Sequence, residues 1–165
     1  MIVAQFVPGS MDVVASSRAA NKEIVLECLG EVHFGPPYYA LWIRVLGRDR
    51  FFGPGRDVVH GSTCELSPDG RFLILERWRG LGAPDNTAVA LDLFESREVV
   101  VAQLGNGFLR QVKFEPGLDR LGSSVCVIHY DVFDGSVWTS REMQIDKLSE
   151  LGDWHPLTWW REEEK

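Results

Sequence analysis

The residues in this sequence best suited to nucleophilic catalysis are Cys126 and His129, with Asp131 close behind them. A cysteine nucleophile requires a base within hydrogen-bonding reach of its thiol. The alternation of apolar residues predicts that this segment is a strand, in which residues three positions apart point to opposite faces. Cys126 and His129 would then not meet, so we expect Cys126 to be a small, buried apolar residue.

A metal site could be assembled from two pairs of ligands, His60 with Cys64 and Cys126 with His129. The first pair shares a face if its segment is extended. The second pair does not, for the same reason of strand parity. Because zinc sites usually gather their ligands more tightly, on turns, we expect no bound metal.

Two pairs of carboxylates, Asp92 with Glu95 and Asp131 with Asp134, stand where strands approach tight turns. Side chains at such positions accept hydrogen bonds from turn N–H groups, and we expect that structural role for them. The sequence contains no glycine-rich phosphate loop, dinucleotide-binding fingerprint or metalloprotease motif. It therefore predicts a protein without catalytic residues or a cofactor; a small enzyme with an unrecognised site is a further interpretation.

The net charge is −7, from 17 basic and 24 acidic residues, and the whole acidic excess lies after residue 60. Binding of nucleic acid requires a positive surface, so this balance argues against it. An acidic surface suits a basic protein partner, because complementary fields speed association. The alternative is that the acidity serves solubility alone.

The three cysteines are far apart and form no Cys-x-x-Cys pair, which suits a reducing compartment. The apolar run at the N-terminus is interrupted by Pro8 and lacks the basic residues of a signal peptide. No apolar stretch is long enough for a membrane span. We therefore expect a cytoplasmic protein that does not enter a membrane.

Short alternating apolar runs separated by Gly, Pro, Asn and Asp predict an all-β, mainly antiparallel domain over residues 1–165. The expected strands cover residues 22–29, 38–46, 71–78, 87–94, 97–104, 108–115, 124–133 and 136–145. Residues 12–20 could form a strand or a short helix, and residues 145–151 one or two helical turns. Residues 152–165 form a tail rich in Trp and Glu.

A unit of strand, tight turn and strand is repeated, at residues 41–52, 89–100 and 129–138. The second unit is lengthened by an insertion in the loop 79–86, where added residues are best tolerated. This loop is therefore a candidate for recognition.

The run Ser67-Pro68-Asp69-Gly70 followed by apolar residues resembles a segment of WD40-type β-propeller blades. Residues 88–93 resemble the third strand of such a blade, and the resemblance covers about residues 61–140. No Trp-Asp dipeptide ends a strand, and the chain holds fewer units than the four blades of the smallest closed propeller. We therefore expect a curved sheet, a sandwich or an incomplete propeller-like domain.

Surplus aromatic residues and acidic turns predict a surface for a protein partner, with rings at its centre and an acidic rim. The candidate partner-binding residues are Tyr38, Tyr39, Trp78, Asp85, Asp134, Trp138, Trp154, Trp159 and Trp160. An alternative for the three C-terminal tryptophans is that they cover an open edge or end of the sheet.

A small acidic protein of this kind resembles, at the level of class, bacterial immunity proteins. That resemblance implies a stoichiometric inhibitor that occludes the active site of a cognate toxin, often a nuclease with a basic cleft. The second hypothesis is a scaffold or accessory domain that self-associates through exposed strand edges into a homo-oligomer.

Overall fold

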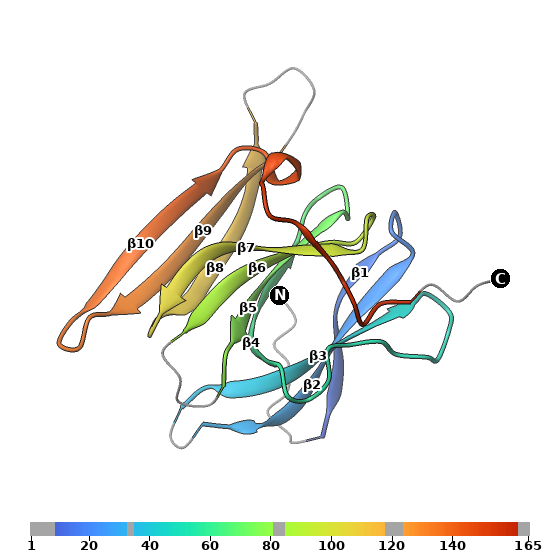
Figure 1. Cartoon of the computed structure of the whole chain (residues 1–165), viewed down its shortest axis with the longest axis horizontal. Helices are drawn as coiled ribbons and strands as arrows, with labels where there is room; N and C mark the ends of the chain where they lie inside the picture. Colours follow the sequence, from blue (N-terminus) through green and yellow to red (C-terminus); the bar gives the residue numbers. More distant parts are fainter. Residues whose placement is uncertain (1–8, 33–34, 81–84, 118–123, 162–165) are drawn as a thin grey trace.

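The structure is a computed structural model that describes residues 9–32, 35–80, 85–117 and 124–161 (Figure 1). Within these ranges the regular structure is antiparallel β-strand, apart from one short 3-10 helix. The strands are β1 (Met11–Ser17), β2 (Lys22–Glu31), β3 (Pro37–Val45), β4 (Val59–Leu66), β5 (Phe72–Trp78), β6 (Asn86–Asp92), β7 (Arg97–Gly105), β8 (Phe108–Pro116), β9 (Ser124–Phe133), β10 (Trp138–Ile145) and β11 (His155–Pro156), and the 3-10 helix is η1 (Leu148–Glu150).

The strands form two open sheets, one of eight strands in the order β1-β2-β3-β4-β5-β6-β7-β11 and one of three strands in the order β10-β9-β8. The larger sheet nearly divides between β3 and β4, which are paired only at Tyr39 and His60. Figure 1 shows β1–β3 on one side of β4–β7 and the three-stranded sheet on the other. The prediction of a curved, open, all-β domain is confirmed.

Two hydrophobic cores hold these layers together, one on each face of β5 and β6. Ile74 and Ala88 point into the core shared with β8–β10, whereas Leu73 and Val89 point into the core shared with β2 and β3. All four side chains have no exposed surface. The central layer is therefore buried on both faces, which explains the continuous apolar runs in its strands.

Six predicted strands appear as β2, β3, β5, β6, β7 and β8 with shifts at their ends. Strand β9 has the predicted bounds, and β10 begins two residues later than predicted, at Trp138. Residues 12–20 contribute to a strand, β1, and residues 145–151 contain the single turn η1. The sequence did not predict β4, because His60, Gly61, Ser62 and Thr63 interrupt any apolar alternation. It also missed β11, which has only two residues.

The expectation for the paired carboxylates is confirmed for one member of each pair. Asp92 Oδ1 accepts hydrogen bonds from the N–H groups of Phe94 and Glu95, and Asp134 Oδ1 accepts them from Ser136 and Val137. Asp134 is therefore the structural counterpart of Asp92.

The expectation is wrong for Asp131. Its carboxylate lies on β9 and accepts a hydrogen bond from the Ser140 hydroxyl at 2.7 Å, across to β10. In the repeat Asp131 corresponds to Asp92, the last residue of β6, but β9 continues for two more residues to Phe133. The two carboxylate pairs therefore do not occupy equivalent positions.

The C-terminal tail packs along the edge of the larger sheet. His155 and Pro156 pair with the start of β7, and Leu157 donates its N–H to Ser96. Leu157 and Trp160 are buried in the core between β2–β3 and β5–β6. The tail therefore closes the open end of that core, as in the alternative stated for its tryptophans.

No helix among the residues that the structure describes is long and apolar enough to cross a membrane.

Candidate functional site

The most distinctive surface of the molecule is the face of the three-stranded sheet that points away from the core. Strand alternation places Cys126, Ile128 and Tyr130 of β9 on the core side. His129 and Asp131, which alternate with these residues along β9, therefore point outwards. Along β10 this outer face is open, because Trp138, Ser140 and Glu142 are exposed, whereas Val127 of β9 is buried.

At the hairpin end of this face the side chains of Phe108, Phe133, Val137 and Trp138 form a group that we call the aromatic patch. Phe133 and Trp138 are directly paired across β9 and β10, and their ring centroids are 5.1 Å apart. Phe108 at the start of β8 lies 6.0 Å from Trp138. Trp138 is 52% exposed and Val137 59% exposed, so the patch combines ring packing with open apolar surface.

The turn between β9 and β10 holds this patch in place. The Asp134 carboxylate accepts hydrogen bonds from the N–H groups of Val137 and Ser136 and from the Ser136 hydroxyl. These bonds lower the pKa of Asp134, with the Val137 N–H contributing most. Because the negative charge is stabilised at neutral pH, the tip of the hairpin keeps a defined acidic turn beside the exposed Val137.

A polar cavity of about 280 Å³ lies next along the same two strands. Ser140 donates its hydroxyl proton to Asp131, and the Arg110 guanidinium donates to both, at 3.2 Å to Ser140 and 3.4 Å to Asp131. His129 is paired across the strands with Glu142. The cavity is lined by Arg110, His129, Tyr130, Asp131, Ser140, Arg141 and Glu142.

The candidate nucleophile does not lie in this cavity. Cys126 is fully buried in the core, and its burial raises the pKa of its thiol to about 12. His129 points to the opposite face, so the prediction that these two side chains do not meet is confirmed. The two pairs of candidate metal ligands are likewise not assembled, and the described residues contain no cluster of three potential ligands.

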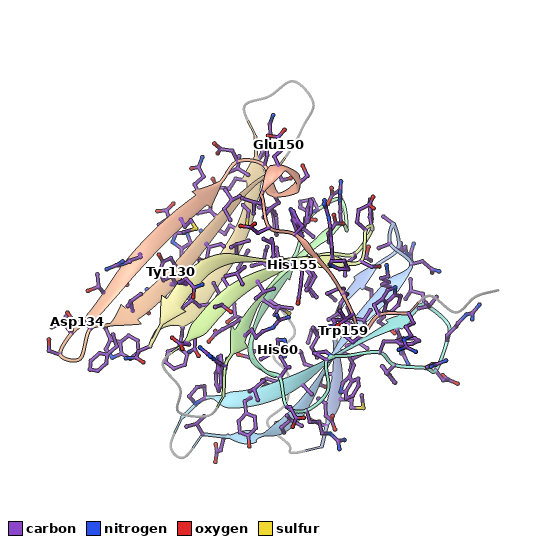
Figure 2. The ribbon with its side chains drawn as sticks, viewed as in Figure 1. His60, Tyr130, Asp134, Glu150, His155 and Trp159 are labelled. Atoms are coloured by element: carbon purple, nitrogen blue, oxygen red, sulfur yellow. The ribbon has the colours of Figure 1, made fainter. Side chains whose placement is uncertain are left out.

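The structure separates the nine predicted partner-binding residues into distinct locations. Asp134 and Trp138 lie at the hairpin tip, and Figure 2 shows Asp134 at the left edge of the molecule, far from Trp159 in its right half. The nine predicted residues therefore cannot belong to one compact site.

Several of the other predicted residues are parts of the cores. Tyr39, Trp78 and Trp160 are only 1%, 5% and 8% exposed, so the prediction that they are surface residues is wrong. Tyr39 and Trp78 are buried at strand positions that face neighbouring layers, and Trp160 is buried where the tail packs on the core. Tyr38, Trp154 and Trp159 are half-buried. 

Asp85, from the predicted recognition loop 79–86, is exposed and forms an ion pair with Arg79 at 3.0 Å. Residues 81–84 of that loop lie outside the described residues.

Sequence reasoning missed Phe108, Phe133 and Val137 as members of the site. The available signal was the position of two turns, Asn106-Gly107 before β8 and Asp134-Gly135 after β9. Only the observed pairing of the strands shows that both turns lie at the same end of the sheet, where Phe108 is paired with Asp131.

A second hollow, with a volume of about 570 Å³, lies between the edges of the two sheets. It is lined by Val99, Val100 and Val101 of β7, by Met143, Gln144 and Ile145 of β10, and by Asp146, Lys147, Glu150, Leu151 and Gly152 around η1. Val100 is 48% exposed there, and β10 has a strand neighbour on one side only.

Comparison with family models, with curated proteins and with solved structures finds no match to this chain.

Proposed function

We propose that this chain is a non-enzymatic binding protein that recognises another protein through the aromatic patch and the outer face of β8–β10. The observation that carries the proposal is the Trp138 ring, which is 52% exposed and packs beside Phe108 and Phe133 at the end of the three-stranded sheet. Large rings at the centre of a patch with polar groups around them are typical of binding hot spots.

The charges beside the patch support a partner with a basic surface. Asp131, Asp134 and Glu142 adjoin the rings or line the neighbouring cavity. Two arginines, Arg110 and Arg141, also line the cavity, and Arg110 already donates hydrogen bonds to Asp131 and Ser140. With a net charge of −7, the protein would attract a basic partner at long range and orient it on approach.

Within this class, we propose a cytoplasmic immunity protein whose partner is a toxin with a basic substrate cleft, such as a nuclease. Carboxylates at the hairpin tip would occupy the positions of substrate phosphates while Trp138 anchors the contact. The three cysteines are free thiols, as suits a reducing compartment.

Co-expression with the product of the neighbouring gene tests this proposal. We expect a stable complex with one copy of each protein and protection of the Trp138 indole from fluorescence quenching by acrylamide. A complex in which Trp138 stays as accessible as in the free protein would contradict the assignment of the surface, and absence of any complex would contradict the proposed function.

A second candidate function, a self-associating scaffold, is favoured by the unpaired edge of β10 beside the exposed Val100. Such an edge can add a strand from another copy of the chain. Light scattering distinguishes the two, because a scaffold forms a stable homo-oligomer alone, whereas an inhibitor stays monomeric until its partner is added.

A further inference from the structure

Glu76 of β5 is a buried carboxylate at the contact between the two sheets. Its side chain lies among β4, β5 and β8, and the residue is 3% exposed. Oε1 accepts a hydrogen bond from Trp78 Nε1 at 2.5 Å, and Oε2 accepts one from the Leu109 N–H at 3.1 Å. The second bond joins the larger sheet to the first residues of the smaller one.

The space for this carboxylate depends on a glycine in β4. A Cβ atom at Gly61 would lie 3.0 Å from both Glu76 Cδ and Glu76 Oε2. Any side chain at this position would therefore push against the carboxyl group, so the close approach of β4 to Glu76 requires Gly61.

Both hydrogen-bond donors to Glu76 adjoin the aromatic patch. Trp78 packs edge-on against Phe108 with 6.0 Å between centroids, and Phe108 lies 6.0 Å from Trp138. Leu109 follows Phe108 directly in β8. Glu76 thus positions Phe108 in two ways, through the Trp78 ring that packs against it and through the backbone of the adjacent Leu109.

The same surroundings bring the pKa of the Glu76 carboxyl group into the physiological range. Burial raises the pKa of the carboxyl to about 7, against the lowering effect of the hydrogen bonds from Trp78 and Leu109. The Gly61 and Leu109 groups nearest to it cannot titrate.

Other titratable groups on the neighbouring strands face elsewhere. Arg77 of β5 interacts with His60 of β4 and Glu98 on the opposite face, and Arg110 of β8 points to Asp131 and Ser140 on the outer face. Tyr130 of β9 is paired with Leu109 and points into the core.

We propose that Glu76 is a proton-dependent latch: its ionised form fixes Trp78 and Leu109 and so orders the aromatic patch, and its protonation loosens the patch. The biological meaning of the latch, control of partner binding by pH, rests on the proposed function of that surface.

The chemistry of the carboxyl group gives the direction of this effect. An ionised carboxylate only accepts hydrogen bonds, and bonds to a charged acceptor are about twice as strong as those to a neutral one. On protonation both bonds become neutral, and one oxygen gains a proton that itself needs an acceptor. The patch is therefore held more firmly above pH 7 than below it.

The stability of the whole fold has the opposite dependence on pH. The pKa of Glu76 is raised in the folded state, from 4.5 to about 7, so an unfolded chain ionises first as pH rises. The contribution of this group to stability is present below its unfolded pKa and is lost as pH rises towards the folded value. Ionisation of Glu76 therefore strengthens its hydrogen bonds to Trp78 and Leu109 while it lowers the stability of the fold as a whole.

The test uses the free protein and proton–nitrogen NMR spectra recorded between about pH 5 and about pH 9, a range that brackets the raised pKa. We expect the Trp78 indole, the Leu109 amide and the Trp138 indole to shift together with one midpoint of about 7. Glu76→Gln is expected to abolish this shared titration. Glu115→Gln, at an exposed position of β8, the strand that contains Leu109, is expected to leave it unchanged.

A second variant guards against misfolding of Glu76→Gln. Trp78→Phe keeps a ring against Phe108 but removes the indole donor that lowers the pKa, so the Leu109 amide should titrate at a higher pH than in the parent protein. The latch is refuted if these signals do not titrate near neutrality, or if the Leu109 midpoint is unchanged by Trp78→Phe. Because no partner is present, either result leaves the proposed function of the surface to be judged separately.

Discussion

The central layer and the three-stranded sheet are built from similar alternating strands but differ in what covers their faces. Leu73 and Ile74 of β5 face two different cores and are fully buried. In β10, by contrast, only Ile145 is buried, and Trp138 is half exposed. The first region supports the fold, and the second leaves a face available for binding.

The largest expected difference between the regions is in the cost of removing an apolar side chain. Leu73→Ala should lower the free energy of unfolding by about 3 kcal/mol, because it removes packing and leaves a cavity in the core. Val137→Ala, at a 59% exposed position in the hairpin between β9 and β10, should change it by less than about 0.5 kcal/mol. Urea unfolding of both variants measures the contrast, and similar losses would show that the central layer is not the structural centre.

A tryptophan in the core of the larger sheet and one on the three-stranded sheet should differ in the same direction. Trp160→Ala removes a ring that is 8% exposed in the core beneath the tail and should cost about 3 kcal/mol. Trp138→Ala removes a ring that is 52% exposed and should cost about 1 kcal/mol or less, mainly through its contacts with Phe108 and Phe133. Thermal unfolding compares the two, and an equal or larger loss for Trp138 would make the aromatic patch a structural element.

Asp92 and Asp134 provide a matched comparison of turn carboxylates. Both accept hydrogen bonds from turn N–H groups, but Asp92 is fully buried and also bound by Arg71 and Arg97, at 2.9 Å and 3.0 Å. Asp92→Asn should destabilise the protein by about 3 kcal/mol, because it breaks a buried charge network. Asp134→Asn should have a smaller effect, since its carboxylate is exposed.

The effect of Asp92→Asn should depend on pH. Burial raises the pKa of Asp92, but the hydrogen bonds from Arg71 and Arg97 outweigh it and lower the pKa below 3.8. The stabilisation is therefore complete above the unfolded pKa and is lost as pH falls through the lower, folded value. Urea unfolding should show a large difference in stability between the parent and the variant at pH 7 and a smaller one in acid. An equal difference at both pH values would mean that the charge of Asp92 does not contribute to stability.

The sequence was sufficient to locate most strands but not to assign their faces. Alternation and glycine-rich turns predicted eight of the eleven strands, because these signals are local. β4 was missed because it is polar at His60 and Thr63, although His60 is fully buried between strands. Burial of a polar strand depends on neighbours that are distant in the chain.

The same limitation applied to the candidate site. Trp78 and Trp138 are the same residue type, but one is 5% and the other 52% exposed. Phe108 joins Trp138 only because β8, β9 and β10 pair in one register. Binding of a partner by an aromatic and acidic surface remains a prediction. The residues proposed for that surface lie at one end of the three-stranded sheet.

The central claim, that the bare face of the three-stranded sheet binds a protein partner, is tested most directly by measuring a dissociation constant. Calorimetry with the purified product of the neighbouring gene should show that Trp138→Ala weakens binding by about 30-fold or more, as for a hot-spot residue. Phe94→Ala, at a ring that is 46% exposed on a different turn, should bind as the parent protein does. Equal affinity of the parent protein and Trp138→Ala would contradict the account.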